Sequence, residues 1–206
     1  MSELSPPQQQ RSRETLNAIS EATKRLLQKH TFAELTIEQI IKDAGSSTGS
    51  FYARFKGKRA LLHHIHEEHA EASRRNVQQF VDAMAGRRLS LEAFTELWIP
   101  EVVQTHFENR GLFRATMIET LEDPEFAIRG GKTVRYVSSR LAKIVANPWD
   151  TEDAHIRNIE QSMRAVMAIL DQDLLYVRQD RLRKLSAERV NRLKRIFRAS
   201  MTPDLP

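Results

Sequence analysis

The segment that decides the fold runs from Thr36 to Leu62 and reads TIEQIIKDAGSSTGSFYARFKGKRALL. Thr36 is a predicted helix N-cap, because its hydroxyl is suited to accept a backbone N–H from the opening turn. Gln39 stands three residues later, where a capping box requires it. Gly45 supplies a tight turn after this helix. The helix itself carries apolar residues at helical spacing, namely Ile37, Ile40 and Ile41.

A second short helix follows the turn. Ser47 or Thr48 is its predicted cap, and Phe51 and Phe55 form its apolar underside. The next helix begins near Lys58. Two short helices joined by a tight turn form a helix-turn-helix, in which the second helix enters the major groove of DNA. We therefore predict DNA contacts from Thr36, Ser46, Ser47, Thr48, Gly49, Ser50, Tyr52, Arg54 and Lys58.

The chemistry of these residues suits a nucleic acid. Short hydroxyl side chains let a helix sit deep in the groove and bond to phosphates or base edges. Gly49 has no side chain, so backbone and DNA can come close there. Tyr52 suits a phosphate or a thymine methyl, and Arg54 suits guanine or phosphate. A loop with a cap and a pair of core aromatic residues is the plainer interpretation of the same segment.

The same positions resemble the DNA-binding motif of the tetracycline-repressor (TetR) family of bacterial regulators. Two positions depart from that motif: Ile41 stands where the family usually has Ala, and Ser46 where it usually has Val. The resemblance implies a homodimeric repressor whose larger domain binds a small molecule that releases the protein from DNA. The residues that carry it are Thr36, Ile37, Ile40, Ala44, Gly45, Ser47, Gly49, Phe51, Tyr52, Phe55, Lys58 and Leu61.

Helical periodicity continues to the end of the chain, so we predict an all-α protein of nine helices. We expect a disordered N-terminal arm at 1–10, which is rich in Ser, Pro and Gln. The helix-turn-helix DNA-binding domain should span 11–57, with its first helix starting at Arg11. An effector-binding and dimerisation domain should span 58–206.

Large apolar residues of the middle helices are candidates for an effector pocket, because ligand cavities are mostly apolar. The candidates are Phe80, Met84, Phe94, Trp98, Phe107, Phe113 and Met117. We expect a small apolar or aromatic ligand, with His106 among the possible polar contacts. The alternative is an ordinary filled core. Under that alternative the chain is a DNA-binding regulator without a small-molecule effector, controlled by a partner protein.

The last two helices carry apolar stripes that predict a dimer interface. One short helix reads only a few base pairs, whereas two copies read a palindromic double-stranded operator. The alternative is that both stripes belong to an internal core. The interface residues predicted are Ile159, Met163, Val166, Leu170, Leu174, Leu193 and Phe197.

Composition limits the remaining classes. The 206 residues include no cysteine, which excludes disulfides and thiolate metal sites, and residues 1–60 hold 10 Lys/Arg against 6 Asp/Glu. The first ten residues lack a signal-peptide pattern, and no apolar run is long enough for a bilayer. We expect a cytoplasmic protein without a membrane partner, catalytic residues, metal or cofactor. The cluster His63, His64, His66 and His69 is expected to be solvated or at a domain interface.

Overall fold

The structure is a computed structural model, and it describes residues 6–147, 151–176 and 187–201. In those ranges the secondary structure consists of nine α-helices and one isolated parallel bridge, between Leu89 and Val145. The prediction of an all-α fold is therefore confirmed. The helices are α1 (Pro6–Leu27), α2 (Ile37–Asp43), α3 (Thr48–Tyr52), α4 (Lys58–Ala83), α5 (Leu91–Glu108), α6 (Arg110–Glu122), α7 (Pro124–Leu141), α8 (Glu152–Tyr176) and α9 (Ala187–Ser200).

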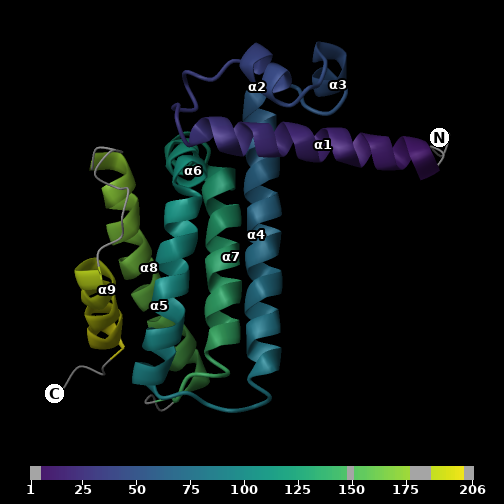
Figure 1. Cartoon of the computed structure of the whole chain (residues 1–206). Coiled ribbons are helices and arrows are strands. Elements are labelled where there is room, and N and C mark those ends of the chain that lie inside the picture. The colour runs from purple at the N-terminus through teal and green to yellow at the C-terminus, as the bar shows by residue number, and fades with distance from the viewer. Residues whose placement is uncertain (1–5, 148–150, 177–186, 202–206) are drawn as a thin grey trace. The chain divides into compact units, whose positions relative to one another are not determined.

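The chain divides into two compact units, Met1–Glu68 and His69–Pro206, so the division falls inside α4. In unit 1, α1 packs against α2, and α2 packs against α3 (Figure 1). Its core is formed by aliphatic and aromatic side chains that are almost fully buried: Ile19, Ala22, Leu27, Leu35, Ile40, Phe51, Phe55, Leu61, Leu62 and Ile65.

Helix α1 begins at Pro6, five residues earlier than the start we predicted at Arg11. Proline is compatible with the first turn of a helix because the N–H it lacks has no partner there. Glutamine has a good helix propensity, so the segment PPQQQ can extend the helix. The predicted disordered arm is therefore helical over 6–10, and residues 1–5 lie outside the described residues.

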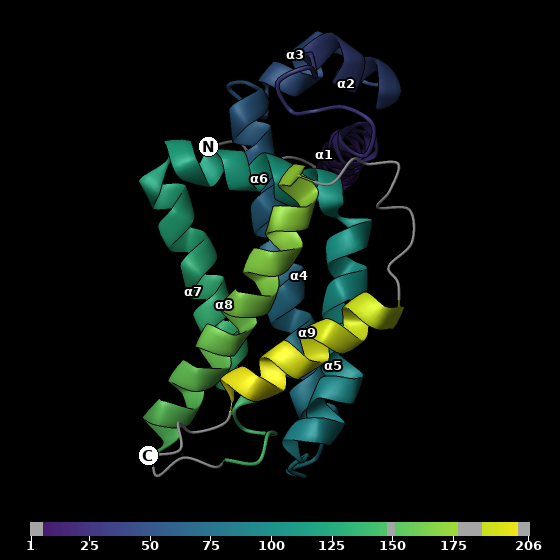
Figure 2. The same ribbon diagram turned by 90° about the vertical axis from the view of Figure 1, so that its left-hand side faces the viewer.

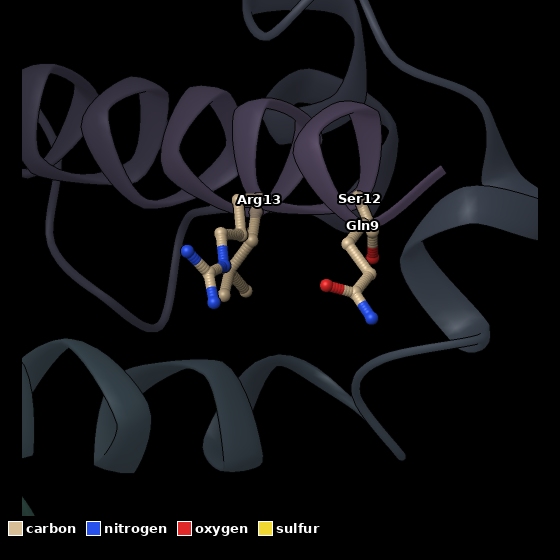
Figure 3. A pocket seen from close by; sticks show the side chains of 4 residues that line it. Gln9, Ser12 and Arg13 are labelled. Carbon is tan, nitrogen blue, oxygen red and sulfur yellow. The ribbon is translucent and has the colours of Figure 1, made fainter. Parts of the chain in front are cut away.

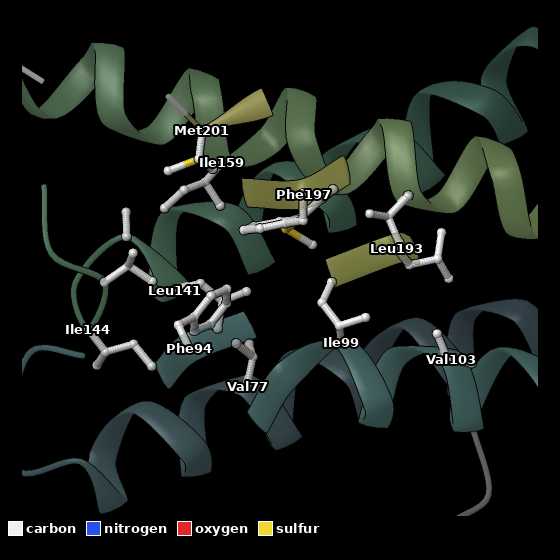
Figure 4. Packing of buried hydrophobic residues seen from close by; sticks show 14 of the residues in the cluster. Val77, Phe94, Ile99, Val103, Leu141, Ile144, Ile159, Leu193, Phe197 and Met201 are labelled. Carbon is white, nitrogen blue, oxygen red and sulfur yellow. The ribbon is translucent and has the colours of Figure 1, made fainter. Parts of the chain in front are cut away.

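Unit 2 contains the rest of α4 and the helices α5–α9. Helix α9 lies across α5 and α8, and α7 runs beside α8 (Figure 2). The inward faces of these helices meet in one apolar cluster that includes Phe94, Ile99, Ile159 and Phe197 (Figure 4). Backbone hydrogen bonds of 2.7 and 2.8 Å join Leu89 to the segment after α7.

Candidate nucleic-acid interface

Helix α2 begins with the capping box that the sequence predicts. The backbone N–H of Gln39 donates to Oγ1 of Thr36 over 3.2 Å, and the Thr36 N–H donates to Oε1 of Gln39 over 2.8 Å. Two N–H groups that the helix leaves free are thus satisfied. In the same first turn, a bond from the Glu38 backbone and one from the Thr36 hydroxyl lower the pKa of the Glu38 carboxyl. The cap therefore fixes where the helix-turn-helix begins.

The turn between α2 and α3 depends on Gly45, whose φ is +60°. Side chains other than glycine rarely adopt this conformation. The following residue, Ser46, donates its backbone N–H to the Ile41 carbonyl over 2.9 Å. Its hydroxyl oxygen is buried and has no hydrogen-bond partner among the described residues. Ser46 therefore points into the protein, whereas we predicted that it faces outward.

Helix α3 is capped by Ser47, which decides between the two predicted caps. The Ser47 hydroxyl accepts the Ser50 backbone N–H over 3.2 Å and donates to the Ser50 hydroxyl over 3.0 Å. Thr48 and Gly49 are exposed, and Tyr52 is 56% exposed. The outward face of α3 thus presents two hydroxyls, a bare backbone and a phenol ring.

The inward face of α3 is aromatic, as predicted. Phe51 is fully buried and Phe55 is 6% exposed, with their ring centroids 5.6 Å apart. The Phe55 ring also lies 5.5 Å from the His64 ring of α4. Because large buried rings leave a short helix few alternative positions, this packing holds the outward face in place.

Arg54 is engaged by the protein itself. Its guanidinium donates to the Ser50 carbonyl over 2.7 Å, and to the carbonyl and hydroxyl of Ser12 over 3.3 and 3.1 Å. These bonds tie the end of α3 to the N-terminal half of α1. Arg54 therefore helps to position α3, and the contact with guanine or phosphate that we predict for it stays a prediction.

Lys58, the first residue of α4, has a similar role because it binds the loop before α2. Its ammonium donates to the carbonyls of Phe32, Ala33 and Leu35 over 2.8, 3.1 and 2.8 Å, and it lies 4.9 Å from the centre of the Phe32 ring. An ammonium has three N–H donors. All three are used here, so Lys58 secures the loop instead of offering a free charge to phosphate.

Some other cations of unit 1 have no partner in the described structure. Within the described part of this unit, five exposed cationic side chains make no ion pair or side-chain hydrogen bond: Arg11, Arg13, Lys29, Lys42 and Lys56. Lys42 lies in the last turn of α2, and Lys56 follows α3 in the sequence. Neither lysine is among the predicted DNA contacts, because a sequence does not show which lysines already have partners.

The comparisons with known proteins agree with this geometry. The family described as "Bacterial regulatory proteins, tetR family" matches residues 19–65, which include the capped helices and the turn. Residues 19–65 are thus similar to the DNA-binding segment of TetR-family regulators. This match supports a DNA-binding transcriptional regulator of the helix-turn-helix type.

Solved structures share the fold of this chain. Salmonella enterica GusR superposes with a TM-score of 0.59 at 17% identity, covering 91% of this chain and 95% of that chain. A transcriptional regulator (TerR/AcrR family) from Aquifex aeolicus VF5 superposes with a TM-score of 0.54 at 18% identity, covering 90% and 96%. The comparison with curated proteins gives no match. In the described residues, no helix is long and apolar enough to cross a bilayer.

The predicted effector-pocket residues fall into two groups in unit 2. Phe94 stacks on Trp98 at 5.5 Å, and Phe197 contacts both rings, so these residues belong to the apolar core with Phe80 and Met84. The other group, Phe107, Phe113 and Met117, is partly exposed and lies outside that cluster.

His106 lies beside the second group. It is 3% exposed, its ring stacks on Phe113 at 4.5 Å, and its Nε2 is 3.2 Å from Oδ1 of Asp171. His69 contacts the Phe113 ring edge at 5.0 Å, whereas His64 pairs with Glu68 in unit 1. His64 and His69 thus belong to different units, although both lie on α4.

The residues predicted for the dimer interface lie inside unit 2. Each is at most 8% exposed in a single chain: Ile159, Met163, Val166, Leu170, Leu174, Leu193 and Phe197. The apolar stripes of α8 and α9 face each other and α5, and a side chain covered by its own chain offers no surface to a second copy. Residues that remain exposed on α8 include Ala168 and Leu175.

Proposed function

We propose that the protein represses transcription by binding a palindromic operator as a homodimer, with one α3 in each of two successive major grooves. The observation that carries this proposal is the arrangement of α3. The helix is capped by Ser47, held from below by Phe51, and presents Tyr52 outward with 56% of its surface exposed. A short helix held in this way has the geometry that base reading requires.

The contacts divide by chemistry. Thr48 and Tyr52 face outward on α3 and would meet base edges or the nearest phosphates. Lys42, in the last turn of α2, and Lys56, just after α3, carry ammonium groups without a partner in the described structure. Phosphate contacts by such groups supply most of the affinity. Ser47 and Arg54 act through the position of α3, because their polar groups are already bonded within the unit.

Dimerisation follows from the size of the reading helix. The five residues of α3 cover only a small part of one groove. Two copies whose reading helices lie about 34–36 Å apart would read successive turns of the same face. We propose the outward faces of α8 and α9 as the contact, since their inward faces are already used in the core of unit 2.

Release by a small apolar or aromatic ligand is the remaining element of the proposal. Phe107, Phe113 and Met117 offer partly exposed apolar surface, and the buried His106 offers polar atoms beside it. A ligand that binds one arrangement of the two reading helices better than another would shift the population away from the DNA-bound form.

Electrophoretic mobility shifts with the protein's own promoter fragment test the proposal. We expect Tyr52→Ala to weaken binding at least tenfold, a loss of about 1.4 kcal/mol. Lys56→Ala should weaken binding to every duplex. Lys29→Ala is the matched control, because Lys29 follows α1 and lies outside the two helices of the helix-turn-helix. Unchanged affinity in Tyr52→Ala and Lys56→Ala would refute the assignment of α3 as the reading helix.

A further inference from the structure

The N-terminal half of α1 lies beside the end of α3. The guanidinium of Arg54 bridges the two helices, because one of its nitrogens donates to both oxygen atoms of Ser12. Helix α1 then continues from Ser12 back to Pro6. The residues next to Ser12 in the sequence therefore flank the point at which α1 is bonded to the end of α3.

Two arginines flank Ser12, and both are exposed without a partner among the described residues. The acid nearest to them on α1 is Glu14, whose carboxylate accepts a hydrogen bond from the Gln10 amide over 3.0 Å. It forms no ion pair with Arg11 or Arg13 in the described structure. Their positive charges are thus not neutralised within unit 1.

Helix geometry places these arginines on different sides of α1. Each residue advances about 100° around a helix, so Arg11 and Arg13 are separated by about 200°. Gln9 and Arg13 extend from the same side of α1 and line a hollow with Ser12 and Leu16 (Figure 3). Arg11 therefore projects from the opposite side.

The side of Arg13 continues into the buried face of α1. Residues seven apart lie nearly on one line of a helix. The line from Arg13 passes through Ser20, which is 1% exposed, and Leu27, which is also 1% exposed. Arg13 thus extends the face that packs into unit 1.

The side of Arg11 is the side that meets the helix-turn-helix. Its line passes through Ala18 to Arg25, and Nη2 of Arg25 lies 2.8 Å from Oδ2 of Asp43 at the end of α2. Both partners of this ion pair are exposed. Arg11 therefore lies on the same side of α1 as Arg25, about 21 Å further along the helix axis toward its N-terminus.

We propose that Arg11 binds a phosphate of the operator backbone next to the base pairs that α3 reads, so that α1 adds a second DNA contact to the helix-turn-helix. A guanidinium matches the geometry of a phosphate and stays charged at any working pH. This inference rests on the proposed reading of DNA by α3. It extends the DNA interface beyond the two helices of the motif.

Arg11→Ala and Arg13→Ala form a matched pair for the test, since both remove one exposed arginine from the same turn of α1. Affinity for the promoter duplex is measured by fluorescence anisotropy over a series of salt concentrations. We expect Arg11→Ala to bind several-fold more weakly at low salt, and its plot of log K against log salt to be shallower by about 0.9, the value for one lost phosphate contact. Arg13→Ala should match the parent protein.

Two further measurements separate the possible causes. A random duplex should show the same loss in Arg11→Ala, because a phosphate contact carries no sequence information. Thermal unfolding should be unchanged in both variants. Parent-like affinity and slope in Arg11→Ala, or an equal loss in Arg13→Ala, would overturn the inference. If Tyr52→Ala still loses binding in that case, the proposed function stands without this contact.

Discussion

Neighbouring cations of the helix-turn-helix unit differ in what their charge is bonded to. The Lys58 ammonium is enclosed by three carbonyl oxygens, whereas Lys56, two residues earlier, is exposed and has no partner in the described structure. A similar contrast separates Arg54, which joins α3 to α1, from Arg11. One member of each pair stabilises the unit, and the other has a charge available for DNA.

Lys58→Met should therefore destabilise the protein, whereas Lys56→Met should leave its stability almost unchanged. A hydrogen bond from a charged donor contributes about 1.5–3 kcal/mol to stability. Lys58→Met removes the ammonium donor from three carbonyl oxygens. We expect the free energy of unfolding to fall by about 2 kcal/mol in Lys58→Met and to stay within about 0.5 kcal/mol in Lys56→Met. Urea unfolding followed by circular dichroism measures both values. Equal stability of the two variants would contradict the role given to Lys58.

Because His155 is buried, we expect the free energy of unfolding to depend on pH. It is 2% exposed, and burial lowers the pKa of its imidazole, against the smaller opposing effect of the Val145 and Ala142 carbonyls. The folded protein therefore resists protonation, while the unfolded chain takes up a proton near the ordinary pKa of 6.5. The stability that His155 contributes is present above pH 6.5 and is lost as the pH falls toward the folded-state pKa.

Comparison with His155→Leu isolates this contribution from that of the other histidines. Below pH 6.5, the parent protein should lose stability relative to His155→Leu by up to about 1.4 kcal/mol for each pH unit. Thermal and urea unfolding between neutral and mildly acidic pH measure the difference. Parallel stability curves for the two proteins would show that the buried ring does not titrate between the two states.

At the scale of the element, Gly45 and Gly49 give contrasting tests of the helix-turn-helix. Gly45 has a φ of +60°, and a side chain there is strained even though an added Cβ would meet no atom within 4 Å. Gly45→Ala should cost about 1 kcal/mol of stability. Gly49 lies inside α3 with ordinary backbone angles and open space around it, so Gly49→Ala should stabilise the helix by up to about 1 kcal/mol.

Gly49→Ala also tests the contact between α3 and DNA. If α3 sits deep in the groove, the methyl group of Gly49→Ala occupies the space where backbone and DNA come close. We expect weaker binding by a more stable protein, measured by mobility shift and thermal unfolding on the same sample. Gain of stability together with unchanged affinity would show that α3 contacts DNA through other residues only.

Local elements of this fold were predictable from the sequence to a useful degree. The capping box at Thr36 and Gln39 is confirmed by the structure. It was predictable because both partners lie within four residues of one another. The start of α1 was placed too late, since a Pro and Gln segment is equally compatible with a first helical turn. Ser46 was assigned outward because spacing alone does not show how the positive φ of Gly45 turns the chain.

Contacts between distant residues were harder to predict. The sequence identifies Arg54 and Lys58 as cations near α3, but their partners Ser12 and Phe32 lie far away in sequence. The apolar stripes of α8 and α9 were correctly located, whereas periodicity cannot say whether a stripe packs within one chain or against a second one. In this structure the apolar residues of the stripes, such as Ile159, are buried in the core of unit 2 of the same chain.

At the scale of the whole molecule, the proposed dimer makes a prediction about operator spacing. Two reading helices held on one assembly require their half-sites to lie on the same face of the duplex. Inserting about five base pairs between the half-sites rotates one of them by half a turn of B-DNA, which has roughly 10–10.5 base pairs per turn. We expect at least a tenfold loss of affinity in fluorescence anisotropy. Full binding to the rephased duplex would exclude simultaneous reading by a rigid pair.

The enclosure of Lys58 also has a consequence for chemical labelling. Amine-reactive reagents attack a lysine nitrogen that is not held by hydrogen bonds, whereas the Lys58 nitrogen donates to the carbonyls of Phe32, Ala33 and Leu35. Lys56 should be acylated at the rate of a free lysine, while Lys58 should react only when the loop opens. The ratio of the two adducts, read by mass spectrometry of the unmutated chain, would report how often unit 1 opens.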